Sequence, residues 1–440
     1  MTPTQSILAF AAAAHTLPPE IAAAATALLG DTLAVGAAGS SAPGADGVYA
    51  AAQLWGAGDD APLLGRAGRL PAPAAAFANG FQIHSLEWDA VHEVAVVHAM
   101  SVVTAALHAV CARAAARGAP VAPDRALVAL AVGVDIACGL GLAATEGMRF
   151  FRPATAGLIG AALACARVAG TPPAAFADVL GLAVSQASGT MQAHVEGSQA
   201  LPLQIAAAAR AAVTAVDLAN AGLTGPHDAL EGPFGYFKLF EGGVIERYSA
   251  SIGSGWRIGE VSIKPWPSGR AAHATLGVLA AMIRDAGVTA AQVHEVQAHV
   301  PPLVGRMIGR PWVPQMTPAY ARLCLPLLAA LMLSEGRIDP RRFEAATFTD
   351  ANLRAIGDRV RVIEVAGDAN ALSPQRIVVM LSDGRVLDRQ VPATPGHPAN
   401  PLPAADQAAK LRFALSLAVG PVDPRIRDNP LAWLVDQGER

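Results

Sequence analysis

Charge is scarce in this sequence, and it is divided almost evenly between the two signs. Only 15% of the 440 residues are charged, with 32 Lys and Arg against 35 Asp and Glu, and the formal net charge is −3. No block of like charges stands out along the chain. Because binding to nucleic acid depends on a concentrated positive field, we expect no nucleic-acid partner.

Cysteine is rare as well, and no two cysteines lie close together in the sequence. Cys111, Cys138, Cys165 and Cys324 lie mostly within stretches of Ala, Leu and Val, and there is no CxxC motif. This distribution predicts reduced, buried thiols and a cytoplasmic protein. The first apolar run also lacks a basic segment before it, so we expect no export signal.

Apolar residues, by contrast, are abundant. They make up 53% of the chain, and the mean hydropathy is +0.37. The most apolar stretch, residues 126–145, carries Asp135 near its centre and is rich in Ala and Gly. Since a charge at that position is costly in a bilayer, we predict a helix buried in a large α-helical core and no membrane partner.

The pattern of residues divides the chain into two kinds of region. Residues 7 to about 270 form Ala-rich segments of helical length separated by Gly and Pro, which predicts a helical bundle. Residues 291–302 and 359–367 alternate like strands, and 376–391 resembles a hairpin around Asp383-Gly384. Residues 320–339 and those from 404 onward are predicted to be helical. The fold prediction is therefore mainly α: a large all-α domain of residues 1–262 and 396–440, with a smaller α+β domain of residues 263–395 inserted.

Titratable residues gather in one short stretch, IHSLEWDAVHEVAVVH, at positions 83–98. It contains His84, His92 and His98 together with Glu87, Asp89 and Glu93. The HExxH motif of zinc peptidases is incomplete, because Val96 stands where the second histidine would be. On a helix, His84 and His98 would lie about 20 Å apart along the axis, and His92 and His98 would face different sides. We therefore predict no metal site.

Two interpretations of this stretch follow from the residues alone. In the first, the carboxylates cap a helix start and the histidines are hydrogen-bonded residues at its rim. In the second, a loop entering a helix over residues 94–108 brings carboxylates and a histidine together in a cleft as general acid and base groups. The spacing does not decide between them.

Several segments, in order, resemble the MmgE/PrpD family, whose members include 2-methylcitrate dehydratase, cis-aconitate decarboxylase and iminodisuccinate epimerase. The first is NGFQIHSLEWDAVHEVAVVHAMS (79–101), followed by SQASGTMQAHVEGS (185–198), AGLTGPHDALEGPFGYF (221–237), IKPWPSGRAAH (263–273), MTPAY (316–320) and PGHPANPLPAADQAAK (395–410). The resemblance implies a large α-helical domain made from two chain segments, an inserted α+β domain, a cleft between them and a homodimer. It also implies an enzyme that needs no redox cofactor and no obligatory metal.

The resemblance implies a set of site residues. The catalytic residues would be Glu87, Asp89, His98, Lys264 and Tyr320, which suit proton transfer next to a carboxylate. The ordinary alternatives are a helix-lining histidine, a surface lysine and a tyrosine used for packing. Contacts to the substrate are expected from His84, His92, Arg152, Gln204, Arg270 and Thr317.

The chain departs from the family pattern at several of these positions. Arg152 replaces a histidine, Leu201 and Gln204 replace a lysine and a histidine, and Glu87 replaces an aspartate. Leucine neither transfers a proton nor binds an anion, whereas arginine can clamp a carboxylate but carries protons poorly.

The function prediction follows from the matches and the departures together. We predict a cofactor-independent enzyme of the dehydratase or decarboxylase type, acting on a small di- or tricarboxylate by proton abstraction or donation. The alternatives are an epimerase or isomerase of a smaller carboxylate and a pseudo-enzyme that only binds a carboxylate.

Overall fold

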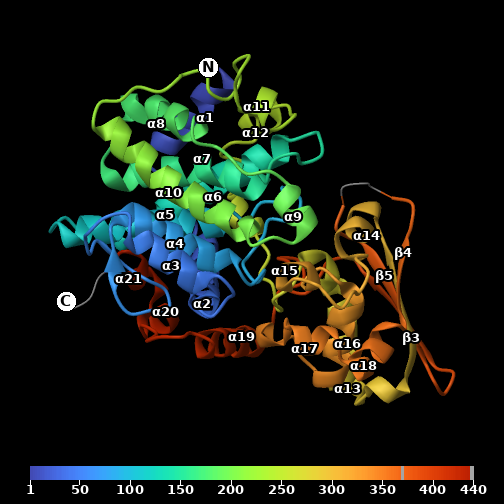
Figure 1. The fold of residues 1–440 in the computed structure, drawn as a ribbon. Helices are drawn as coiled ribbons and strands as arrows, with labels where there is room; N and C mark the ends of the chain where they lie inside the picture. Colours follow the sequence, from blue (N-terminus) through green and yellow to red (C-terminus); the bar gives the residue numbers. More distant parts are fainter. Residues whose placement is uncertain (368–370, 437–440) are drawn as a thin grey trace.

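The computed structural model describes residues 1–367 and 371–436, so residues 437–440 of the predicted larger domain lie outside the described residues. The chain is mainly α-helical, as predicted, with one small mixed sheet of four strands and one two-stranded ribbon. Figure 1 shows a larger helical lobe and a smaller lobe that contains the mixed sheet.

The larger lobe is built from the helices of the first half of the chain and the last three helices. These are α1 (Pro3–Ala12), α2 (Pro19–Gly39), α3 (Ala45–Gln53), α4 (Ala72–His84), α5 (Ala99–Ala116), α6 (Pro123–Ala143), α7 (Arg152–Ala169), α8 (Phe176–Val184), α9 (Gln192–Glu196), α10 (Ala200–Asn220), α11 (Tyr236–Leu239), α12 (Glu246–Ser249), α19 (Ala404–Ser416), α20 (Arg425–Asp428) and α21 (Pro430–Leu434). The ribbon pairs β1 (Ala61–Pro62) with β2 (Arg69–Leu70). Single 3-10 turns occur at Pro173–Ala175 and Arg257–Glu260.

The last helices return to the first ones (Figure 1). Lys410 on α19 pairs with Asp31 on α2 at 2.6 Å, and both side chains are buried. The larger hydrophobic cluster takes residues from Ile7 to Ile263 and again from Ala414 to Val435. Both ends of the chain therefore stabilise the same core.

Small residues let the central helices approach closely. A Cβ added to Gly160 on α7 would lie 2.2 Å from the backbone oxygen of Gly133 on α6. Neither helix could keep its position with a larger residue at this crossing. The Ala- and Gly-rich composition thus sets the spacing of the bundle as well as its helix propensity.

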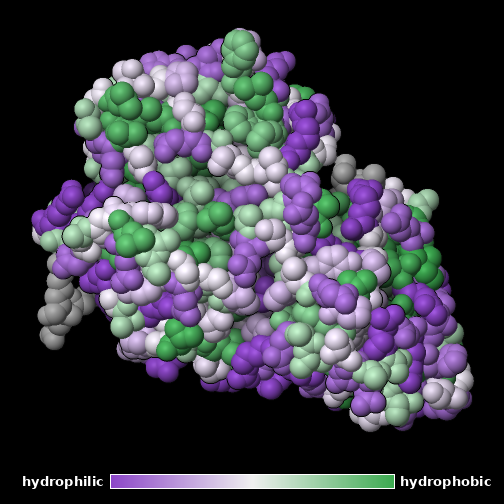
Figure 2. Space-filling view, viewed as in Figure 1, coloured by the Kyte–Doolittle hydropathy of each residue, from purple (hydrophilic) through white to green (hydrophobic). Residues whose placement is uncertain are grey.

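Four helices are long and apolar enough to cross a bilayer, judged by length and composition alone: α2, α5, α6 and α10. Within the structure, 89% of the apolar window of α6 is buried, and the windows of the other three are 61% to 78% buried. Asp135, in the middle of α6, pairs with Arg257 at 2.8 Å inside the core. Figure 2 shows hydrophobic and hydrophilic residues interspersed on one face of the molecule. The four cysteines are free and buried, as predicted.

The smaller lobe packs helices against a sheet. Its helices are α13 (His273–Ala286), α14 (Pro302–Ile308), α15 (Pro318–Ala321), α16 (Leu325–Glu335), α17 (Ala345–Phe348) and α18 (Ala351–Gly357), with 3-10 turns at Arg270–Ala272, Ala290–Gln292 and Pro340–Arg342. Its strands are β3 (Val293–Val300), β4 (Val360–Glu364), β5 (Gln375–Leu381) and β6 (Val386–Val391). A second hydrophobic cluster, from Ala271 to Leu381, fills this lobe.

The sheet has the order β4-β3-β5-β6. β3 runs parallel to β4, with Val296 opposite Val360, and antiparallel to β5. The predicted strands and hairpin are present, and Gly384 in the hairpin turn has a φ of 88°, which glycine adopts without strain. The burial of β3 alternates over part of its length because one face of the sheet packs on helices.

The segment between α4 and α5 is not helical. α5 begins only at Ala99, with His98 as the residue before it, whereas the sequence predicted a helix from Val94. Glu87 and Val96 within this segment have φ values of 53° and 52°, in the left-handed region that β-branched and bulky residues rarely adopt. The segment therefore forms a loop, and this loop carries most of the titratable residues of the 83–98 stretch.

Candidate active site

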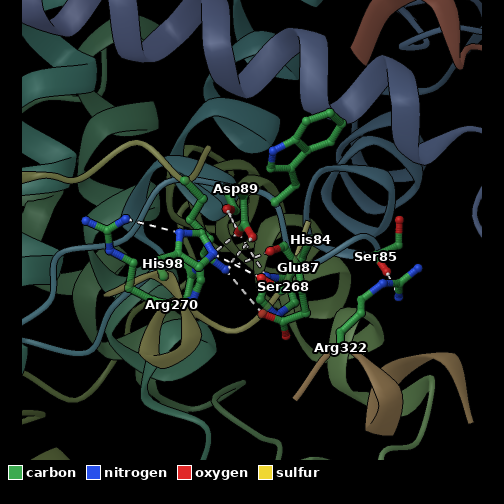
Figure 3. Close-up of polar contacts among 12 residues, drawn as sticks. His84, Ser85, Glu87, Asp89, His98, Ser268, Arg270 and Arg322 are labelled. Carbon is green, nitrogen blue, oxygen red and sulfur yellow. Dashed lines mark hydrogen bonds and ion pairs between the residues drawn. The ribbon is translucent and has the colours of Figure 1, made fainter. Parts of the chain in front are cut away.

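Asp89 is the centre of a buried polar cluster (Figure 3). Its side chain is fully buried, and Oδ2 accepts hydrogen bonds from Nδ1 of His84 at 2.9 Å, from Nδ1 of His98 at 3.0 Å and from the hydroxyl of Ser101. Burial alone would raise the pKa of Asp89, but the two imidazoles hold it well below its usual range. Asp89 is therefore a fixed negative charge that orients both rings.

His84 and His98 lie in contact, contrary to the prediction that they would be about 20 Å apart. Their ring centroids are 4.8 Å apart. The prediction was wrong because it treated residues 84–98 as one helix, whereas the loop turns back after the end of α4. The two histidines thus come from the end of α4 and the start of α5.

The two rings differ in how readily they hold a proton. Burial lowers the pKa of His84, but Asp89 and Glu87 outweigh this effect and raise it above its ordinary value. For His98, burial is the larger effect, with Lys264 adding to it, so its pKa is lowered despite Asp89. His84 therefore holds a proton more readily than a free imidazole, whereas His98 is neutral at neutral pH.

The hydrogen bond to Asp89 also fixes the tautomer of His98. An ionised carboxylate only accepts hydrogen bonds, so Nδ1 must carry the proton. The neutral ring then has its lone pair at Nε2. His98 lines the larger of two adjoining cavities, which makes it suited to act as a general base.

Lys264 lies behind the cluster and is not a surface lysine, since it is 1% exposed. Its ammonium donates to the backbone oxygen of Glu87 at 3.0 Å and to the carboxylate of Glu87 at 3.2 Å, and it lies 3.9 Å from Oδ1 of Asp89. Although burial opposes it, Lys264 together with His84 and His98 lowers the pKa of Glu87 to about 2. Glu87 is thus held as an anion on a strained backbone, and such strain is common at functional sites.

Two cavities meet at Glu87. The larger, of about 560 Å³, is lined by Glu87, His98 and Lys264, and the smaller, of about 450 Å³, by His84, Glu87 and Arg322. Both cavities take residues from the two lobes, so the cluster lies at the junction between them. Glu87, Asp89, His98 and Lys264, predicted from separate segments, are therefore brought together at one place.

The guanidinium group of Arg152 is not free to bind a substrate carboxylate. It begins α7 at the wall of the larger cavity, and its Nε and Nη2 donate to both carboxylate oxygens of Glu241 at 2.6 and 2.8 Å, while Nη1 donates to the backbone oxygen of Ala95. Both side chains are buried. The expected carboxylate clamp is thus already occupied by a carboxylate of the chain.

Arg270 is likewise paired within the chain. Its guanidinium contacts the carboxylate of Glu93 at 2.7 Å, donates to the backbone oxygen of Pro395 and lies beside the buried ring of His273, which in turn contacts Ser268. Arg270 lines the larger cavity. Sequence reasoning missed His273 and Ser268, although both lie in the IKPWPSGRAAH segment.

Tyr320 lines neither cavity. Its hydroxyl donates to the backbone oxygen of Pro311 at 3.0 Å, and its ring lies under Arg310. Thr317 does line the smaller cavity, but its hydroxyl donates to Gly197 and caps the turn that holds Tyr320. The structure therefore gives the hydroxyl of Tyr320 a backbone partner and places Tyr320 in neither cavity lining.

His92 and Gln204 also lie outside the two cavity linings. His92 contacts Glu260 through Nε2 at 2.9 Å, and its Nδ1 accepts from the backbone of Ala95, so both ring nitrogens are used. Gln204 donates to the backbone oxygen of Thr190.

Arg322 is a site residue that sequence reasoning missed. It is 3% exposed, lines the smaller cavity and donates to the backbone oxygen of Ser85 at 2.9 Å, while its Nε has no hydrogen-bond partner. Among the described residues, no carboxylate forms an ion pair with it, in contrast to Arg152 and Arg270. Burial lowers its pKa to about 10, so it stays positive at neutral pH. The only signal in the sequence is a basic residue within the apolar run after MTPAY.

His84, Asp89 and His98 could geometrically ligate a metal, since their ligand atoms lie within 4.8 Å of one another. The helical spacing argument therefore excluded such a cluster for the wrong reason. Both Nδ1 atoms are nevertheless directed at one oxygen of Asp89, and Lys264 lies 3.9 Å from the other. A divalent cation here would be repelled by the ammonium, and the Nδ1 atoms of both histidines already have a hydrogen-bond partner, although Nε2 of His84 and Oδ1 of Asp89 have none among the described residues.

Comparison with known proteins identifies the family. The MmgE/PrpD N-terminal domain matches residues 7–247, and the MmgE/PrpD C-terminal domain matches residues 266–427. Cis-aconitate decarboxylase of Homo sapiens is 27% identical over 360 residues, which cover 78% of this chain and 73% of the human protein. The cis-aconitate decarboxylase-like protein oryM of Aspergillus oryzae is 25% identical over 395 residues (84% and 82%), and the cis-aconitate decarboxylase of Mus musculus is 24% identical over 398 residues (87% and 80%). The chain belongs to the MmgE/PrpD family.

Proposed function

We propose that this protein is a lyase that removes carbon dioxide or water from a small carboxylate, with His98 moving the proton. The observation that carries the proposal is the state of His98: its Nδ1 is held by Asp89, its pKa is lowered by burial, and its ring faces a cavity beside Lys264. A neutral imidazole with a fixed tautomer is the arrangement expected of a general base.

The cations around the cluster are suited to bind the substrate carboxylate and to stabilise the negative charge that develops during such a reaction. In a dehydration, Nε2 of His98 would take the proton from the carbon next to a carboxylate while the hydroxyl group leaves as water. In a decarboxylation, the bond to the departing carbon dioxide breaks, and the carbanion takes up a proton from water or from a protonated histidine. In both reactions negative charge develops next to the remaining carboxylate. Lys264, already buried in a water-poor site, would stabilise that charge without reorganisation. Arg322 has a buried Nε without a partner, so a substrate carboxylate would complete its hydrogen bonding.

The relatives support a lyase in particular. The curated proteins to which the chain is similar are named as cis-aconitate decarboxylases or as similar to them. The buried pairing of Arg152 and the apolar Leu201 distinguish this site from the family pattern, so the same reaction on the same tricarboxylate does not follow from the similarity.

The test is turnover of a panel of di- and tricarboxylates with four to seven carbons, followed by proton NMR in deuterium oxide. We expect a new unsaturated or decarboxylated product with the wild-type protein and a loss of at least a hundredfold in rate for His98→Gln. His92→Gln is the matched control, because His92 lies on the same loop and lines neither cavity, and it should retain activity.

Two other outcomes would overturn the lyase proposal. Deuterium incorporation without loss of carbon dioxide or water would identify an epimerase or isomerase. A thermal shift with ligand but no exchange and no product would identify a protein that only binds the carboxylate.

A further inference from the structure

The larger cavity has walls that are mostly apolar. Besides Glu87, His98 and Lys264, it is lined by Val96, Leu142 and Met148 of the larger lobe and by Leu303, Met307 and Leu372 of the smaller lobe. Leu303 and Met307 lie on α14, whereas Leu142 ends α6, so apolar side chains approach the cavity from both lobes. Such a lining favours a ligand that buries hydrocarbon.

The buried charges at this cavity are already balanced. Lys264 pairs with Glu87, and the guanidinium groups of Arg152 and Arg270 pair with Glu241 and Glu93. Arg247 and Arg306 also line the cavity, but both are exposed at its rim. Every additional substrate carboxylate in the interior would have to share a cation that a protein carboxylate already holds, which is costly in a buried site.

Among the described residues, only one buried cation at the site forms no ion pair with a carboxylate. This is Arg322 in the smaller cavity, on the other side of Glu87. Leu201 lines both cavities, is 4% exposed and offers no charge where they meet. The site is therefore built for a ligand that is acidic at one end and apolar at the other.

We infer that the substrate has at most two carboxylates and carries an apolar substituent of several carbons. Its acidic end would lie at Arg322 and Lys264, and its substituent along Leu303 and Met307 in the larger cavity. This inference rests on the proposed function for the location of the reaction and adds the class of substrate.

Saturated acids test the inference separately from turnover, because they have neither a hydroxyl group to lose nor a double bond. Titration calorimetry would compare succinate, methylsuccinate, propylsuccinate and hexylsuccinate with tricarballylate, which is succinate bearing a carboxymethyl group. We expect affinity to rise by up to about fourfold for each methylene that becomes buried. Propylsuccinate should bind more tightly than tricarballylate.

Two variants locate the substituent. Met307→Gln should reduce the gain per methylene, while Val386→Gln, on an exposed position of β6 that lines neither cavity, should leave it unchanged. Leu201→Lys should raise the affinity for tricarballylate relative to propylsuccinate at least tenfold. If Leu201→Lys fails to fold, Met307→Gln still decides the question.

The results separate the two proposals. Tightest binding of tricarballylate, no dependence on chain length, or no binding of any alkylsuccinate would overturn the inference. A clear dependence on chain length with no turnover of any unsaturated or hydroxylated acid would leave the inference standing and overturn the lyase proposal.

Discussion

The buried pair of Arg152 and Glu241 offers a sharp test of how this site is held together. The two side chains form a bidentate contact, at 2.6 and 2.8 Å, and are only 7% and 3% exposed. Arg152→Met would leave Glu241 buried without its partner, and Glu241→Leu would leave Arg152 buried without its partner. Removing one partner of a buried pair costs about 3 to 5 kcal/mol, whereas replacing both with apolar residues is often neutral or stabilising.

The expected change in melting temperature follows from the size of the lobe. With an unfolding entropy of about 2.1 cal/mol/K per residue and roughly 300 residues in the larger lobe, a loss of about 3 to 5 kcal/mol lowers Tm by about 5 to 8 °C. The single variants should show this loss by circular dichroism, and the double variant should recover most of it. A double variant whose loss equals the sum of the two single losses would refute the coupling.

The same variants separate a structural role from a ligand-binding role. If Arg152 pairs only with Glu241 and does not contact the ligand, the folded double variant, Arg152→Met with Glu241→Leu, should bind succinate with the wild-type affinity. A tenfold or greater loss of affinity in a double variant with normal Tm would show that Arg152 contacts the ligand, and the pairing argument would then be wrong.

Four further predictions concern the other titratable groups. Because the pKa of His98 is lowered and its neutral form is the base, kcat/KM should stay high at pH 6.5 and fall only at more acid pH. Asp89→Asn removes the carboxylate that raises the pKa of His98, so the fall of kcat/KM on the acid side should move to lower pH. The value of kcat should also drop by roughly 10²- to 10⁴-fold. If the acid side of the pH profile did not move, the hydrogen bond between Asp89 and His98 would not control the pKa of His98. Arg322→Gln should weaken succinate binding by about 1.5 to 3 kcal/mol in a calorimetric titration, and equal affinity would remove Arg322 from the site. Burial lowers the pKa of His108 to about 4, so the folded state disfavours its protonation and loses up to about 3 kcal/mol of stability as pH falls from 6.5 toward 4. His108→Gln should flatten this dependence in urea denaturation, and an equally acid-sensitive variant would contradict it.

Local patterns in the sequence were sufficient to predict the strands of the smaller lobe and the helical character of the larger lobe. The alternation in residues 291–302 and 359–367 corresponds to β3 and β4, and Asp383-Gly384 lies in the turn between β5 and β6. Periodicity carries this information because side chains repeat every two residues in strands and about every 3.6 in helices. Between α4 and α5 the pattern left open whether the polar residues cap a helix or form a loop, and the expected helix start at Val94 was too early, since α5 begins at Ala99.

Several residues that the resemblance named for the site lie together in the structure, but the resemblance did not indicate which side chains they contact. Glu87, Asp89, His98 and Lys264 lie together, whereas Tyr320 does not join them. Within the 83–98 stretch, the assumption of helical spacing wrongly predicted that His84 and His98 would lie far apart. Loop conformation depends on tertiary contacts, such as the bridge between Val91 and Ser262, that no local pattern contains.

The sequence by itself determined which segments become helices and strands, that the core is apolar, and which residue types are available for chemistry. Only the tertiary structure decided which charges neutralise each other. Glu241 lies 89 positions from Arg152 and pairs with the guanidinium that the sequence had offered to a substrate, whereas Arg322 is buried and forms no ion pair with a carboxylate of the described chain. The physical reason is that burying a charge is costly unless the charge is paired or hydrogen-bonded, and which groups meet depends on how distant segments pack.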